Sequence, residues 1–375
     1  MNLQMVDLKG QYQKIKVDVD QAIQEVIDST AFINGPQVSE FQADLEQYLG
    51  VKKVVTCANG TDALQIALMA LGLEPGDEVI VPCFTYVATA EVIALLRLKP
   101  VMVDVDPSSY NVTAEIIEKA ITPKTKAVVP VHLFGQCADM ESILRVAKKH
   151  KLFVVEDAAQ ALGAEYTFAD GSTKKAGTMG DVGCTSFFPS KNLGCYGDGG
   201  ALMTNDEQLA DTIRKIANHG QAKKYYHDVV GVNSRLDTLQ ASILKVKLRQ
   251  LDKYAEARNA AATFYDESFA GLDWLTTPKR SANSSHVFNQ YTLKIDPSID
   301  RDEFKKYLAD QKVPSMVYYP VPLNHQNAFK TEDSQAQSFP VSEALCKQVI
   351  SLPIHTEMTG EQLNFIVAAV QKFKA

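Results

Sequence analysis

Lys191 is the residue with the clearest chemical potential, because of its neighbours along the chain. It follows the hydroxyl-bearing and apolar run 185–190 and precedes the glycine-rich segment 194–200. An amine that condenses with an aldehyde must be partly deprotonated, which requires apolar surroundings or a nearby cation. The run before Lys191 supplies apolar surroundings, and the glycines allow a ligand to approach closely. The alternative is an ordinary solvated lysine in a loop, the usual state of this residue type.

An acid closes an apolar, strand-like run upstream of this lysine. Asp157 ends the run 153–157, at the carboxyl end of a predicted parallel strand, where open α/β sheets bind ligands. A carboxylate there can keep a pyridine nitrogen protonated, or can cap a helix that begins at Ala158. Gln160 could bond to a phenolic oxygen of the same ring. A Schiff-base lysine paired with such a carboxylate is what pyridoxal phosphate chemistry requires, so we predict that cofactor.

A third motif predicts a phosphate site. Residues 57–64 form a turn between a predicted strand and a predicted helix, and contain Gly60, Thr61 and Asp62. Backbone N–H groups at a helix start bind anions, and the Thr61 hydroxyl adds a donor. Ser186 offers a second hydroxyl.

Other side chains have two interpretations each. Tyr86 follows the next predicted strand, where it could stack on a pyridine ring or simply pack in the core. Arg235 is a candidate for binding a carboxylate through its guanidinium fork, or for a structural ion pair. His219 could contact a substrate or cap a turn.

The apolar pattern around these motifs predicts an α/β fold. Residues 15–50 are expected to be helical with a turn at 34–36, and short strands then alternate with helices. The expected strands lie at 54–55, 78–81, 101–105, 127–131 and 152–155, and the helices at 62–71, 86–97, 113–120 and 140–150. Apolar strands that alternate with helices predict a mostly parallel sheet covered on both faces.

The alternation of short strands and helices ends after residue 237. One long helix is expected over about 238–269, linking a large cofactor-binding domain (1–245) to a smaller C-terminal α+β domain (246–375). The small domain should hold strands at 291–295 and 315–318, helices at 301–311 and 360–372, and surface loops at 280–286 and 331–337.

Composition excludes several classes of function. The 375-residue chain has a net charge of −7, which argues against a nucleic-acid partner. Its six cysteines show no C-x-x-C spacing, so we expect buried free thiols in a reducing compartment and no metal site. No basic and apolar leader or membrane-length apolar run is present, which predicts a cytoplasmic protein without a membrane partner.

Together these motifs resemble the DegT/DnrJ/StrS sugar-nucleotide aminotransferases, within the fold type I, aspartate aminotransferase-like enzymes. The matching blocks cover most of the chain: 35–36, 57–64, 84–89, 156–160, 186–191, 197–200 and 231–236. The resemblance implies a large domain with a mostly parallel seven-stranded sheet and a homodimer with two shared active sites. It implies that Lys191 carries the cofactor, Asp157 binds the ring nitrogen and Gln160 meets the phenolate oxygen. The remaining implied cofactor contacts are Gly60, Thr61, Asp62 and Ser186 at the phosphate, Tyr86 on the ring, and Asn233 at the phosphate of the neighbouring subunit.

Within that family the blocks are most similar to enzymes that aminate C3 of UDP-2-acetamido-2-deoxy-3-oxo-glucuronate for surface polysaccharides such as O-antigen. L-Glutamate would be the amino donor and 2-oxoglutarate the product. One departure concerns the sugar site, where the family often has His-Tyr-Pro and this chain has Tyr318, Tyr319 and Pro320. Alternatives are a dTDP-linked 3- or 4-keto-6-deoxysugar substrate, or a non-catalytic regulatory protein on the same scaffold. Relatives with histidine at the lysine position are dehydratases, and Lys191 argues against that activity.

Overall fold

A seven-stranded sheet forms the centre of the protein in the computed structural model, which describes residues 3–330 and 337–373. Most of the loop expected at 331–337 lies outside the described residues. The strand order is β1-β9-β8-β5-β4-β2-β3. The strands are β1 (Lys53–Cys57), β2 (Glu78–Pro82), β3 (Lys99–Val103), β4 (Thr125–Val128), β5 (Phe153–Asp157), β8 (Val182–Ser186) and β9 (Gly200–Thr204).

The pairing within this sheet is mostly parallel. β8, β5, β4, β2 and β3 pair in parallel, with Asp157 opposite Cys184 and Ile80 opposite Val101. β9 is antiparallel to both of its neighbours, β8 and β1. The mostly parallel seven-stranded sheet is therefore confirmed.

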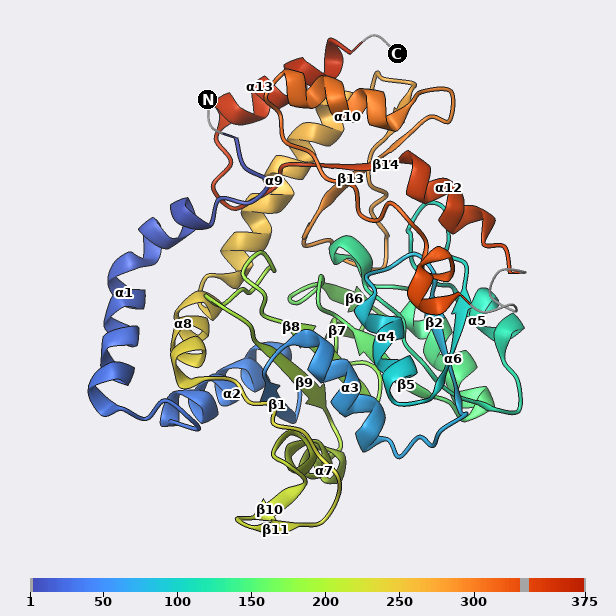
Figure 1. Cartoon of the computed structure of the whole chain (residues 1–375). Helices are drawn as coiled ribbons and strands as arrows, with labels where there is room; N and C mark the ends of the chain where they lie inside the picture. The colour runs from blue at the N-terminus through green and yellow to red at the C-terminus, as the bar shows by residue number, and fades with distance from the viewer. Residues whose placement is uncertain (1–2, 331–336, 374–375) are drawn as a thin grey trace.

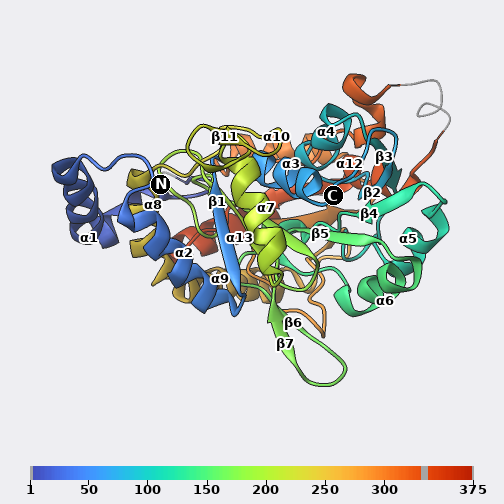
Figure 2. The ribbon, with the colours of Figure 1, turned by 90° about the horizontal axis from the view of Figure 1, so that it is seen from below.

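Helices cover both faces of the sheet. Successive strand residues point to opposite faces, and apolar side chains on both faces need a covering layer. Val79 and Val81 of β2 pack in a core with α3 (Gly60–Ala70), α4 (Ala88–Leu95) and α7 (Glu207–Ala217), whereas Ile80 packs on the other side. That second side is covered by α5 (Ala114–Ala120) and α6 (Met140–His150). Figure 2 shows the sheet between these two helical layers.

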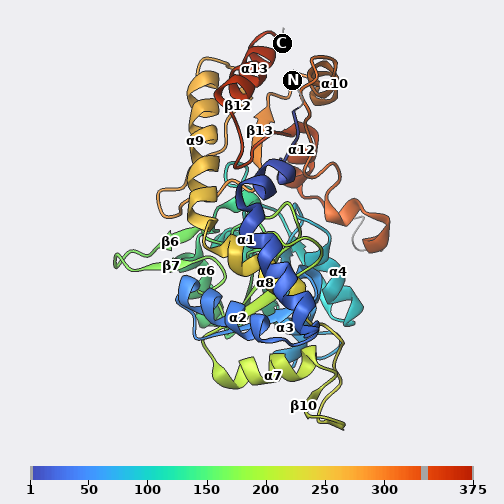
Figure 3. The ribbon, with the colours of Figure 1, turned by 90° about the vertical axis from the view of Figure 1, so that its left-hand side faces the viewer.

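Three further helices form a separate layer next to β1 and β9. They are α1 (Leu8–Ser29), α2 (Pro36–Leu49) and α8 (Thr238–Leu248). Val38, Phe41 and Leu45 recur at helical spacing on α2 and pack against Leu244 of α8. Figure 3 shows α1 in front of α8, with α2 below them.

The C-terminal part has its own antiparallel sheet and core. The strands β12 (Leu275–Thr276), β13 (Tyr291–Ile295) and β14 (Val349–Leu352) are packed against α9 (Leu251–Phe269), α10 (Arg301–Asp310) and α13 (Gly360–Gln371). α9 leads from α8 to this part of the molecule (Figure 1). The remaining elements are α12 (Pro340–Gln348), the hairpins β6–β7 (Glu165–Thr167, Thr173–Lys175) and β10–β11 (Gln221–Lys223, Tyr226–His227), and 3-10 turns at Leu133–Gly135, Leu323–His325 and Asn327–Phe329.

Two features differ from the sequence-based expectation. The strand expected at 315–318 is wrong: Met316 makes only an isolated bridge to Ser351, and the third strand of this sheet is β14. The single helix expected over 238–269 is divided into α8 and α9. At the division the N–H of Gln250 donates to the carbonyl of Lys247, an i−3 bond that tightens the turn. The predicted domain boundary between 245 and 246 therefore falls inside α8, and the boundary stays a prediction.

Candidate active site

Lys191 lies in the loop that joins β8 to β9. Backbone bonds fold this loop tightly: Lys191 N–H donates to the Phe188 carbonyl (2.9 Å), and Cys195 N–H donates to the Phe187 carbonyl (2.8 Å). Gly194 is required by close approach, because a Cβ there would lie 2.3 Å from the Pro189 carbonyl oxygen. The lysine is thus presented from a fixed turn at the end of a central strand.

The environment of Lys191 favours the neutral amine. Burial lowers the pKa of Lys191, and the opposing effect of Asp157 is smaller. Lys191 forms no ion pair within the described chain. A partly deprotonated amine is the nucleophilic form.

Asp157 is buried at the carboxyl end of β5, the neighbour of β8. One carboxylate oxygen accepts from the Thr89 hydroxyl (3.1 Å) and the other from the Ala159 N–H (3.1 Å). The helix considered at Ala158 is absent, because the described residues after Asp157 form turns. The carboxyl group of Asp157 is therefore held by two donors at the edge of the sheet where α/β folds bind ligands.

The strand that carries Asp157 is anchored by its preceding residue. Glu156 is fully buried and accepts from three backbone N–H groups, at Gly177, Met179 and Gly180. Its fourth partner is Nε2 of His132 at 2.8 Å. His132 Nδ1 accepts from a backbone N–H, so the ring proton resides on Nε2 and is donated to Glu156.

The predicted phosphate loop opens α3. The side chain of Asn59 caps this helix by accepting from the Asp62 N–H (2.8 Å). Gly60 allows the loop to touch the end of β8, since a Cβ would lie 2.6 Å from Cβ of Ser186. The carboxylate of Asp62 accepts from the Ser234 hydroxyl (2.6 Å). Gly60 and Thr61 at the N-terminus of α3 and Ser186 at the end of β8 therefore line the cavity together.

Tyrosines close the other side of the cavity. Tyr86 is largely exposed, with its ring centroid 6.3 Å from that of Tyr319. Gln160 accepts from the Phe134 N–H (2.7 Å) and donates to the Tyr319 hydroxyl (3.0 Å). Tyr319 thus connects the C-terminal part of the chain to the predicted cofactor residues.

One cavity of about 860 Å³ brings these groups together. All the predicted site residues line it except Asn233, Arg235 and His219. Those that do are Gly60, Thr61, Asp62, Tyr86, Asp157, Gln160, Ser186, Lys191, Tyr318 and Tyr319.

The other three residues lie on the segment that follows α7, outside this cavity. His219 is exposed with a left-handed backbone (φ 57°), and its carbonyl accepts from Nδ1 of His227. Asn233 is exposed and bridges to Asn218, and Arg235 is half-buried without an ion-pair partner in the described chain. This segment includes the β10–β11 hairpin, which projects from the lower end of the molecule in Figure 1.

Sequence reasoning missed several residues that line the cavity. Asn289 and Gln290 come from the C-terminal part, and Thr185 precedes the predicted Ser186. Thr185 Oγ1 and Gln290 Oε1 are buried and have no hydrogen-bond partner in the described chain. Buried polar atoms without a partner call for one, which a polar ligand in this cavity would supply.

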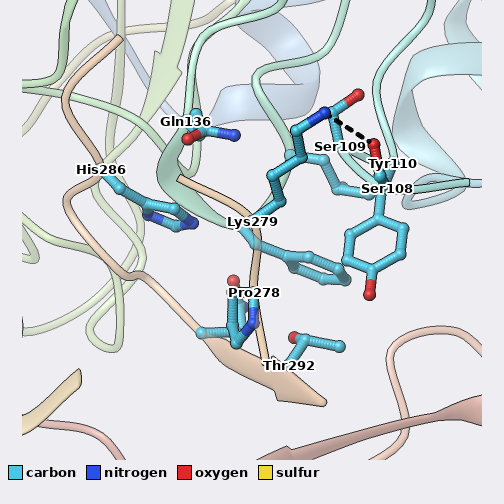
Figure 4. Close-up of a pocket in the computed structure, with 11 residues that line it drawn as sticks. Ser108, Ser109, Tyr110, Gln136, Pro278, Lys279, His286 and Thr292 are labelled. Atoms are coloured by element: carbon cyan, nitrogen blue, oxygen red, sulfur yellow. Dashed lines mark hydrogen bonds between the residues drawn. The ribbon is translucent and has the colours of Figure 1, made fainter. Parts of the chain in front are cut away.

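A second pocket lies beside this cavity but has a volume of only about 10 Å³. Its lining includes Ser108, Gln136, Lys279 and His286, and Lys279 donates to the Ser108 hydroxyl at 3.2 Å (Figure 4). Burial lowers the pKa of His286 to about 3, so this histidine is neutral. The pocket has room for no more than a water molecule.

Comparison with known proteins decides the family. The DegT/DnrJ/EryC1/StrS aminotransferase family pattern matches residues 13–371. The chain belongs to this aminotransferase family. Membership confirms the recognition made from the motifs and the predicted aminotransferase class.

Three curated relatives match this chain over nearly their whole length. UDP-2-acetamido-2-deoxy-3-oxo-D-glucuronate aminotransferase of Pseudomonas aeruginosa is 47% identical, covering 98% of this chain and 99% of the relative. A pleiotropic regulatory protein of Geobacillus stearothermophilus is 44% identical (100% and 99%). UDP-N-acetyl-3-dehydro-alpha-D-glucosamine 3-aminotransferase of Acidithiobacillus ferrooxidans is 43% identical (98% and 97%).

Solved structures agree with the fold of this family. A DegT DnrJ EryC1 StrS aminotransferase from Brucella abortus superimposes with a TM-score of 0.91 at 40% identity, covering 98% of each chain. NtdA from Bacillus subtilis, solved with its cofactor PMP, gives a TM-score of 0.87 at 31% identity, covering 96% of this chain and 81% of that one. The fold prediction is confirmed.

The described part of the chain contains neither a helix suited to crossing a bilayer nor a cluster of residues that could hold a metal ion. All six cysteines are buried and free, as predicted.

Proposed function

We propose that this protein is a pyridoxal phosphate-dependent aminotransferase that moves the amino group of L-glutamate to C3 of UDP-2-acetamido-2-deoxy-3-oxo-D-glucuronate. The observation that carries the chemistry is the meeting of Lys191, Asp157 and the N-terminus of α3 in one cavity. The relative from Pseudomonas aeruginosa supports the substrate. The relative from Acidithiobacillus ferrooxidans, also named for a UDP-linked 3-keto sugar, supports the position of amination.

The lining of the cavity fits this cofactor. Phosphate would be held by Gly60, Thr61 and Ser186, where a helix N-terminus and hydroxyls converge. Asp62 belongs to this loop through its backbone, while its carboxylate is engaged by Ser234. Asp157 would hold the ring nitrogen, and the unpartnered Thr185 hydroxyl is a further donor toward the ligand.

Two more side chains would orient the ring. Tyr86, exposed at the cavity, would stack on its face. Gln160 would meet the phenolate oxygen with its amide nitrogen, which donates to the Tyr319 hydroxyl in the structure. A ligand at this position would therefore share or replace that hydrogen bond.

The cofactor, when bound, supplies a conjugated ring that accepts the electron pair released at the substrate carbon. The chain supplies proton transfer and orientation. The Lys191 amine, whose pKa is lowered by burial, would take and return the proton at that carbon. Asp157 would keep the ring nitrogen protonated through a charge-assisted bond.

The partner side of the site would come from a second copy of the chain. We propose a homodimer in which Asn233 reaches the phosphate of the neighbouring subunit, because Asn233 is exposed and outside its own cavity. On the same segment of the chain, Val229 and Val230 expose 45% and 86% of their surface, and Tyr225 exposes 78%. Clustered exposed apolar side chains are typical of a surface that another chain covers.

The same arrangement bears on the sugar. Lys191 is the only Lys or Arg among the cavity-lining residues of the described chain, beside Asp62, Asp157 and Asp198. A uronic acid therefore needs a cation from outside this set, and Arg235 of the neighbouring subunit is our candidate. His219 of the same subunit would be a further contact to the substrate. Tyr318 and Tyr319 line the cavity and would contact the sugar.

The test is turnover of a panel of UDP- and dTDP-linked keto sugars with L-glutamate, read by mass spectrometry. The UDP-linked 3-keto uronic acid should react fastest. Faster turnover of a dTDP-linked 6-deoxy sugar would replace this substrate by the alternative.

A regulatory role is a second candidate because one relative carries a regulatory name. It is distinguished from catalysis by cofactor loading followed by borohydride reduction. A catalytic protein would retain the reduced cofactor on Lys191, as peptide mass spectrometry would reveal, and would turn over a keto sugar.

A further inference from the structure

Lys247 is a buried cation that the proposed mechanism does not use. It lies on α8 and is 1% exposed. Its ammonium group donates to the Gly194 carbonyl and lies 5.3 Å from the ring centroid of Tyr196. No carboxylate of the described chain forms an ion pair with it. Burial of a cation without a carboxylate partner is costly, so stability does not explain this residue.

The carbonyl that Lys247 engages belongs to the turn that presents Lys191. Gly194 lies three residues after Lys191, in the segment closed by the bond from Cys195 N–H to the Phe187 carbonyl. Gln240, two helical turns earlier on α8, accepts from the Tyr196 N–H (2.8 Å). One helix therefore holds this turn through two side chains.

We propose that Lys247 is a positioning residue, which fixes the turn around Lys191 by holding the Gly194 carbonyl against α8. The inference rests on the proposed role of Lys191. Lys247 is not among the residues that line the cavity, so it would act through the backbone of residues 188–195.

The charges around Lys247 support this role. Burial lowers its pKa to about 8. The groups facing it are Cys195 and Tyr196 on the turn, whose pKa values burial raises to about 11 and about 12, and Arg258 on α9, whose pKa burial lowers to about 10. Between pH 7 and 9, Lys247 is therefore the member of this cluster that changes charge.

The direction of this pKa shift distinguishes a positioning role of Lys247 from a stabilising role. Because the folded-state pKa lies below the ordinary value of 10.5, folding disfavours the ammonium. That cost is fully present below pH 8 and is relieved as the pH rises toward the ordinary value. Removal of the cation should therefore free the turn without lowering the unfolding temperature.

The first experiment compares K247M with the wild type by hydrogen exchange and mass spectrometry of the cofactor-loaded proteins. Amides of residues 187–196 should exchange at least ten-fold faster in K247M, while peptides of β8 and β9 keep their wild-type rates. The unfolding temperature should be equal or higher. K245M is the matched control, because Lys245 lies on the same helix in an ion pair with Glu40 and should leave the turn unchanged. Unaltered exchange in K247M, or faster exchange throughout the sheet, would overturn the proposal.

The second experiment starts from the wild-type chain and varies the pH. Charge-assisted hydrogen bonds are about twice as strong as neutral ones, so the wild-type turn should lose protection as Lys247 deprotonates. Protection of residues 187–196, corrected for the intrinsic pH dependence of exchange, should fall between pH 7 and 9.5. K247R keeps its charge in this range and should flatten the profile. A flat wild-type profile contradicts the proposal.

Turnover completes the test and distinguishes its failure from that of the proposed function. K247M should lower kcat at least ten-fold with KM for the sugar within about two-fold, and K247R should restore most of kcat. A loosened turn with wild-type kcat would show that the turn need not be held, which overturns the positioning role. Failure of the proposed function itself would appear elsewhere, as no amination of any keto sugar by the wild type.

Discussion

Lys191 and Asp157 show how the surroundings of a residue decide its chemistry. The chain has 38 lysines and arginines, most of which have an ordinary place on the surface. Lys191 differs because burial lowers the pKa of its amine, and because it lies near a carboxylate that backbone and hydroxyl donors already satisfy in part. An amine with a lowered pKa beside a carboxylate is suited to proton transfer at neutral pH.

Replacement of Lys191 by alanine should abolish transamination and preserve the fold. General acid–base catalysis alone contributes roughly 10²- to 10⁴-fold, and the nucleophilic role adds to this, so we expect a loss above about 10⁴-fold. The measurement is turnover with L-glutamate and the preferred keto sugar. K245A is the control and should keep wild-type turnover. Near wild-type turnover in K191A would remove Lys191 from the mechanism.

The substitution Asp157→Asn should leave the cofactor bound but slow the reaction by about 10²- to 10³-fold. Removal of a single preorganised electrostatic group from an active site typically has an effect of this size. An amide cannot hold the pyridinium proton by charge. Thr89→Val is the graded control: it removes the 3.1 Å hydrogen bond and keeps the carboxylate, so its effect should be smaller. Turnover and cofactor absorbance are measured for both. If the asparagine variant were fully active, Asp157 would be only a turn-capping residue.

At the scale of elements, local patterns predicted most of what carries the site. The turn before α3, the end of β5 and the loop after β8 each have a local signature of glycine, hydroxyl or acid after an apolar strand. A strand is expected at 315–318 because Val317 and Tyr318 have strand propensity, yet Met316 makes only an isolated bridge to Ser351 and Tyr318 lines the cavity. The division of α8 from α9 has no glycine or proline to announce it, since Arg249 and Gln250 suit a helix.

The proposed phosphate loop (57–64) allows a test at this scale. Gly60→Ala would bring a Cβ within 2.6 Å of Cβ of Ser186, so the loop or β8 must move. We expect pyridoxal phosphate affinity to fall at least ten-fold, measured by equilibrium titration. Gly360→Ala is a matched control, because Gly360 also opens a helix and nothing lies within 4 Å of a Cβ there. That variant should retain wild-type affinity, and an equal loss in both would contradict the steric argument.

At the scale of the whole molecule, the site depends on contacts that no local pattern reveals. Asn289 and Gln290 enter the cavity from the C-terminal part, and Arg258 holds their segment by donating to the carbonyls of Phe288 and Asn289. Ser234 ties the segment of Asn233 to the phosphate loop through Asp62. These links join residues far apart in sequence, so composition and spacing carry no trace of them. Only the resemblance to a family placed Asn233 near a cofactor phosphate, and that placement stays a prediction.

The shared site can be tested by complementation between two inactive chains. Asn233→Ala should weaken cofactor binding at the neighbouring subunit's site, and Lys191→Ala should inactivate its own site. In a mixed dimer, one site would then combine the wild-type Lys191 of the first chain with the wild-type Asn233 of the second. The assay is run at limiting cofactor, where Asn233→Ala homodimers are inactive. Mixing should then restore activity, up to the activity of one wild-type site per mixed dimer. Subunit exchange is verified by native mass spectrometry of differently tagged chains. Asn233 is exposed and lies outside the cavity of its own chain, which is why a shared site is expected. If Asn233 served only its own subunit, mixing would give no recovery of activity after confirmed exchange. That result would refute the shared site.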